Sequence, residues 1–108
     1  MRITYGKLIR DRIPEIMDAA GVRYEVAELG DADYRSALLA KVLEEAEEIA
    51  AATHSDDRTE EIADLYEVLD ALLACEGIAA STVAEVRRRR REERGGFERR
   101  LELRWTEG

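Results

Sequence analysis

Two long amphipathic segments on either side of a short polar turn constrain the fold of this chain more than any other feature. In residues 33–53, apolar side chains recur at spacings of three and four, the period of a helix that covers a core. They are Leu38, Val42, Ala46 and Ile49. Residues 57–76 repeat the pattern with Ile62, Leu65, Tyr66, Leu69, Leu72 and Leu73. Because the turn at 54–57 is short, the two helices are predicted to pack antiparallel.

Other sequence signals divide the remainder of the chain. Pro14 suits a first helical turn and Gly21 a helix end, so residues 13–20 are predicted to form a short helix. Residues 23–29 and 97–105 alternate polar and apolar side chains, as short strands do. These two segments are therefore candidates to pair as a minor two-stranded addition.

The second long helix and one further helix have signals at both ends. Capping-box spacing marks their starts, in Asp57 with Glu60 and in Thr82 with Glu85. Glycines mark their ends, at Gly77 and at Gly95-Gly96. The predicted fold is mainly α, an antiparallel helical bundle in a single domain, 1–108, with the minor β addition.

Charge and apolar content disfavour several classes of protein. Charged residues are 39% of the chain and the formal net charge is -8, which argues against a protein that coats nucleic acid or an acidic membrane. No stretch approaches the roughly 20 apolar residues that cross a bilayer, and the start lacks a signal-peptide core. A cytoplasmic protein without membrane partners is expected. The single Cys75 allows neither an internal disulfide nor a cysteine zinc cluster.

One flank of the first long helix is predicted to carry a column of charge. A helix turns about 100° per residue, which places Glu45 just beside the apolar stripe. Lys41 and Glu48 lie within roughly 60° of Glu45 on the same flank. Glu44 and Glu47 are predicted to point further round, towards solvent.

The second long helix carries an acid inside its apolar arc. Glu61 projects between Val68 and Leu72, and Asp64 lies at the edge of the arc that should be buried. If the helices pack antiparallel, Glu61 and Asp64 meet two carboxylates of the first helix. Four such charges need protons or cations to compensate them. Oxygen ligands favour Mg²⁺, with Mn²⁺ as an alternative, whereas a solvated acidic face is the competing interpretation.

Three motifs together resemble the MazG-like nucleotide pyrophosphohydrolases. The segment Glu44-Glu45-Ala-Glu-Glu48 followed by Glu61-Ile-Ala-Asp64 is similar to the family's E-E-x-x-E and E-x-x-D signature. The N-terminal stretch 7–15, Lys-Leu-Ile-Arg-Asp-Arg-Ile-Pro-Glu, and Arg94-Gly95-Gly96-Phe97 resemble small stand-alone members described as phosphoribosyl-ATP pyrophosphohydrolase-like.

The resemblance implies an all-α fold that oligomerises, and cleavage between the α and β phosphates of a nucleotide. Mapped by motif position, the metal ligands are Glu45, Glu48, Glu61 and Asp64, and Glu48 is the candidate to orient or deprotonate the attacking water. A nucleoside triphosphate, including an aberrant one, is the leading substrate. Phosphoribosyl-ATP is an alternative substrate, and an inactive helical oligomerisation or regulatory module is an alternative of another class.

A polyphosphate substrate also needs cations to bind it. The candidates are Lys7, Arg10, Arg12, Lys41 and Arg94. Lys41 is the best placed of them, although an ion pair with Glu45 explains it equally well. The arginines at 87–91 span more than one helical turn, so they face different directions and are expected to be solvated or paired. Leucines in excess of one small core favour a homodimer or homotetramer.

Overall fold

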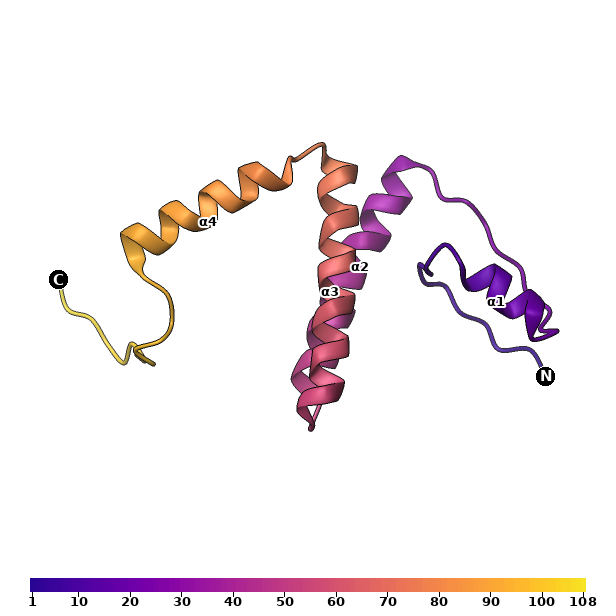
Figure 1. Ribbon diagram of the computed structural model, residues 1–108, viewed down its shortest axis with the longest axis horizontal. Helices are drawn as coiled ribbons and strands as arrows, with labels where there is room; N and C mark the ends of the chain where they lie inside the picture. The colour runs from indigo at the N-terminus through magenta and orange to yellow at the C-terminus, as the bar shows by residue number, and fades with distance from the viewer.

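The computed structural model describes residues 1–108 and contains four helices and no strand (Figure 1). The helices are α1 (Ile13–Ala19), α2 (Asp31–Ala51), α3 (Ser55–Glu76) and α4 (Ala80–Arg94). The prediction of a mainly α chain is confirmed, and each helix lies within two residues of its predicted bounds. No helix combines the length and the apolar content needed to cross a membrane.

The predicted two-stranded addition is wrong. Neither 23–29 nor 97–105 forms a strand, and the two segments lie at opposite ends of the molecule, one before α2 and the other beyond α4 (Figure 1). An alternating segment becomes a strand only when another backbone edge is within reach. Here α4 leads the C-terminal tail away from any such edge.

The predicted capping boxes are also wrong, because both helices begin two residues earlier than expected. His54 is the N-cap of α3 and Ala79 that of α4, and neither makes a side-chain capping hydrogen bond. Asp57 instead lies in the first turn of α3 with Asp56. Acidic side chains there interact favourably with the positive end of the helix dipole.

Gly77 ends α3 as predicted, in the left-handed conformation with φ 68°. Its N–H donates to the Ala74 carbonyl, and the N–H of Ile78 donates to the Leu73 carbonyl at 2.9 Å. Gly77 therefore terminates the helix and redirects the chain towards α4.

We expect Gly77→Ala to lower the free energy of unfolding by about 1 kcal/mol, because a β-carbon is disfavoured in the left-handed region. Gly6→Ala is the control, since Gly6 has no positive φ and no heavy atom lies near its added β-carbon. Urea unfolding of both variants measures the difference. Equal stability of the two would contradict this account of the helix end.

α2 and α3 form an antiparallel hairpin across the short connection 52–54 (Figure 1). Leu38 lies between the two helices and is the one fully buried apolar side chain, at 2% exposure. α1 and α4 lie on opposite sides of the hairpin (Figure 1). The radius of gyration is 18.7 Å, whereas a compact domain of this length has about 13 Å. One copy of the chain therefore leaves most of its apolar surface uncovered.

Candidate metal centre

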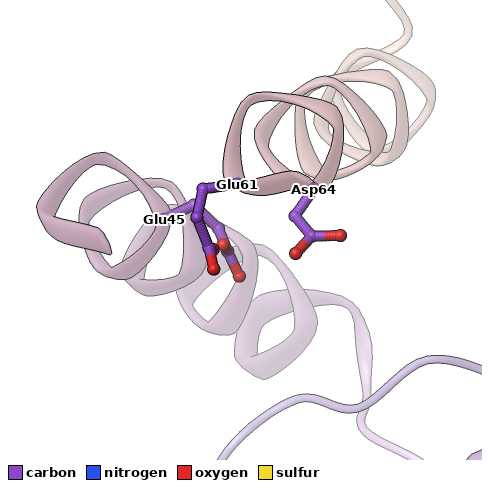
Figure 2. A group of neighbouring side chains, drawn as sticks. All are labelled: Glu45, Glu61 and Asp64. Carbon is purple, nitrogen blue, oxygen red and sulfur yellow. The ribbon is translucent and has the colours of Figure 1, made fainter. Parts of the chain in front are cut away.

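Three carboxylates meet across the middle of the α2–α3 hairpin. Glu45 comes from α2, whereas Glu61 and Asp64 come from α3 (Figure 2). Each contributes one oxygen, and the three oxygens lie within 4.8 Å of one another. We call these three side chains the acid cluster.

Helix geometry and the register of the hairpin produce the acid cluster. Glu61 and Asp64 are three residues apart, so they share one face of α3. Glu45 stands seven residues before Ala52, and Glu61 stands seven residues after His54, on either side of the connection. Antiparallel helices joined by so short a connection bring positions equally far from it side by side.

The acid cluster contains the least satisfied polar groups of the molecule. Glu45 is only 6% exposed. Its Oε2 atom and the Oε2 atom of Glu61 are both buried without any hydrogen-bond partner. An ionised carboxylate oxygen without a donor is unfavourable there unless a cation or a proton compensates its charge. A cation or a proton between the two helices would therefore stabilise these oxygens.

Glu45 and Glu61 both hold their protons more tightly than an ordinary glutamate does. The pKa of Glu61 is raised to about 7, first because a protonated Glu61 would be able to share a hydrogen bond with the nearby Glu48, then through burial and the neighbouring negative charges. Burial is the main cause of the raised pKa of Glu45, and the charge of Glu48 adds to it. Lys41 acts in the opposite direction. Near neutral pH, protons and cations therefore compete for these oxygens.

Lys41 compensates only part of this charge. Its Nζ lies 3.7 Å from Glu45 Oε1 and 3.5 Å from Glu44 Oε2. The ion pair with Glu45, one of the two interpretations of Lys41 from the sequence, is therefore present. Glu44 was expected to point to solvent, but it is half-buried and forms an ion pair with Lys41. One ammonium group is thus shared between two carboxylates.

Arg10 reaches the acid cluster from the N-terminal segment. Its Nη2 donates to Asp64 Oδ1 at 2.7 Å, across 54 residues of sequence. Arg10 is exposed and Asp64 is partly exposed, so the pair contributes less than about 1 kcal/mol to stability. The ion pair matters mainly for position, because it holds the guanidinium group of Arg10 at the edge of the acid cluster.

Glu48, the fourth predicted ligand, lies beside the acid cluster and outside the group of three. It is exposed, yet it is close enough to both Glu45 and Glu61 to raise the pKa of each. The structure therefore brings three of the four predicted acids together and leaves the fourth at the solvent side of the site.

The other predicted phosphate-binding residues occupy three different places. Lys7 and Lys41 line one small cavity of about 80 Å³ between the N-terminal segment and α2. The Nε atom of Arg12 lies 3.4 Å from Oε2 of Glu15, three residues further along the chain. Arg94 lines a separate hollow at the end of α4, which stands away from the hairpin (Figure 1). Within one chain, Arg12 and Arg94 are thus not part of the cluster.

The donor set of the acid cluster fits a hard divalent cation. All three side chains offer carboxylate oxygen, which Mg²⁺ and Mn²⁺ prefer over zinc. Ligands at about 2.1 Å from an octahedral ion are roughly 3 to 4 Å apart, so the 4.8 Å spread needs only a small contraction. The orphaned Oε2 atoms of Glu45 and Glu61 are the acceptors that such an ion would satisfy.

Comparison of the chain with protein-family models, curated protein sequences and solved structures gives no match. The acid cluster is therefore a candidate metal site on the strength of its geometry and of the sequence motifs.

Proposed function

We propose that this chain is a Mg²⁺-dependent nucleotide pyrophosphohydrolase of the MazG-like, all-α kind, with Mn²⁺ as an alternative ion. The observation that carries the proposal is the pair of buried, unpartnered carboxylate oxygens on Glu45 of α2 and Glu61 of α3, which lie together with Asp64 of α3. A merely solvated acidic face would leave its oxygens open to water. Buried acceptors without partners need a compensating cation or proton, and the cation is the part of this proposal that the Mg²⁺ dependence tests.

In the proposed reaction, different residues of the chain would bind the ion and activate the water. Glu45, Glu61 and Asp64 would hold the ion, which when bound supplies charge neutralisation at the phosphates and lowers the pKa of water. Glu48 stands at the exposed edge beside these acids. It is therefore suited to orient the attacking water and accept its proton. Breaking the bond between the α and β phosphates then yields a monophosphate and pyrophosphate.

Cations next to the acid cluster support a polyphosphate substrate. Lys7 and Lys41 line one cavity with Gly6, Leu8, Ala37, Ala40 and Glu44. Arg10 stands at Asp64, at the edge of the same site. Ammonium and guanidinium groups are the usual partners of phosphate oxygens, and here they approach the cluster from the N-terminal segment and from α2.

The proposal is tested by incubating the full chain with Mg²⁺ and a panel of canonical, deoxy and modified nucleoside triphosphates together with phosphoribosyl-ATP. We expect release of pyrophosphate from at least one of them, abolished by EDTA and restored by Mg²⁺ or Mn²⁺. Release of orthophosphate instead would place the cleavage at the wrong bond. Absence of any release from folded protein would favour an inactive helical module.

A further inference from the structure

Two members of the acid cluster already have a cation of the chain as a partner. The Nζ atom of Lys41 lies 3.7 Å from Oε1 of Glu45, and Arg10 donates to Asp64 at 2.7 Å. Glu61, the third member, makes no ion pair. A divalent ion at the acid cluster would therefore share Glu45 with an ammonium group and Asp64 with a guanidinium group.

The two cations differ in how firmly they are held. Lys41 stands on the same helix as Glu45, four residues before it, and its side chain is only 19% exposed. Arg10 belongs to the N-terminal segment and its side chain is 59% exposed. An ion pair at the surface holds two side chains together only weakly. Arg10 is therefore the cation that can leave its acid at small cost.

The backbone of Arg10 is nevertheless fixed next to the site. Its carbonyl accepts a hydrogen bond from the N–H of Ile13 at 3.1 Å, at the start of α1. Leu8 and Ile9, just before it, are half-buried, and Leu8 lines the cavity against α2. Arginine has a long side chain with many rotamers, so the guanidinium group can change partners while the backbone stays in place.

Charge decides which partner the guanidinium group takes. A divalent ion on Asp64 and the guanidinium group of Arg10 are like charges only a few ångströms apart, so each weakens the binding of the other. A polyphosphate carries several negative charges, and a guanidinium group fits phosphate oxygens with two parallel hydrogen bonds. Arg10 is thus repelled by an ion at the cluster and attracted by the substrate.

We propose that Arg10 changes partner: it occupies Asp64 until a divalent ion binds the acid cluster, and it then binds the phosphates of the nucleotide. Loading of the ion frees the guanidinium group for the substrate, so ion binding precedes tight binding of the nucleotide. This inference rests on the proposed function, because it requires an ion at the acid cluster and a phosphate substrate.

Titration of the full chain with Mn²⁺ in the absence of nucleotide tests the first step, with free Mn²⁺ measured by electron paramagnetic resonance. Arg10→Gln should bind Mn²⁺ about 5-fold more tightly than wild type, because a competing cation is removed. Arg10→Lys keeps the charge and should bind Mn²⁺ as wild type does.

Arg12→Gln is the matched control for the titration. It removes the same charge two residues away, from a side chain that is 85% exposed and paired with Glu15. Its affinity for Mn²⁺ should equal that of wild type. An equal gain in affinity from both glutamine variants would mean that the net charge of the N-terminal segment, rather than the contact with Asp64, opposes the ion, and would refute the proposal.

The KM for the nucleotide tests the second step. At saturating Mn²⁺, Arg10→Gln should raise the KM for the nucleotide that wild type hydrolyses about 10-fold, since charged hydrogen bonds to phosphate are lost. Opposite effects on the ion and on the nucleotide identify a change of partner, because a residue that only maintained the shape of the site would weaken the binding of both.

The contrary results separate this inference from the proposed function. Equal or weaker Mn²⁺ binding by Arg10→Gln, with an active wild type, would refute the competition and leave the proposed function standing. An unchanged KM would show that Arg10 does not bind the phosphates. No Mn²⁺ binding by either protein would remove the ion site itself, and with it both the proposed function and the change of partner.

Discussion

Replacing Glu61 by glutamine should remove the response of this protein to Mg²⁺ and reduce pyrophosphate release at least about 100-fold. Even partners that only orient metal ligands are worth about 10- to 100-fold in affinity or activity, and Glu61 would be a ligand itself. Glutamine keeps the shape of the side chain and removes its charge. Loss of activity would therefore report on electrostatics at the cluster rather than on packing.

The matched control is Glu60→Gln, one residue away on the exposed side of α3. It removes the same charge from the same helix and should leave activity and the Mg²⁺ response unchanged. Activity would be measured as pyrophosphate released, and metal binding as the rise in melting temperature with added Mg²⁺. Equal losses in both variants would indicate that overall negative charge, rather than the acid cluster, attracts the ion.

A second pair of variants separates catalysis from metal binding. Glu48 is exposed and lies beside the three clustered acids, so Glu48→Gln is expected to lower turnover by about 100-fold or more while most of the thermal response to Mg²⁺ remains. Glu47→Gln is the control, on the solvent side of α2. If Glu48→Gln also abolished the response to Mg²⁺, Glu48 would be a ligand, as the motif assignment has it.

Local periodicity was sufficient to predict the hairpin and the three members of the acid cluster. Spacings of three and four placed Glu61 and Asp64 on one face, and the short connection made α2 and α3 antiparallel. Glu45 then had to lie opposite Glu61. These inferences succeed because each depends on positions within two adjacent helices.

Contacts between segments that are distant in the chain could not be predicted from the sequence. The pairing of Arg10 with Asp64 spans 54 residues, and no spacing rule connects a flexible polar side chain to one acid among many. Within one chain Arg94 lies away from the acid cluster, and its position was hard to predict because the direction of α4 depends on the single turn at Gly77. The prediction of a strand pair was wrong because alternating polar and apolar residues at 23–29 do not show whether another strand lies close enough to pair with them.

The stability of the metal-free protein should fall as pH rises towards 7, whereas its affinity for Mg²⁺ should increase. The pKa of Glu61 is raised to about 7 in the folded chain, from an ordinary value near 4.5 in the unfolded chain. Below pH about 4.5 both states are protonated and the contribution of Glu61 to stability is fully present. Between those values the unfolded chain gives up its proton first, so that contribution declines until pH passes 7.

The difference in unfolding free energy between wild type and Glu61→Gln isolates this effect, because the other titrating groups are common to both proteins. In EDTA, wild type should lose stability relative to the variant from pH 5 to pH 8. Stabilisation of wild type by Mg²⁺ should grow over the same interval, since the ion binds the ionised carboxylates. A difference that does not change with pH would mean that Glu61 is ionised throughout and that the buried oxygens already have another partner.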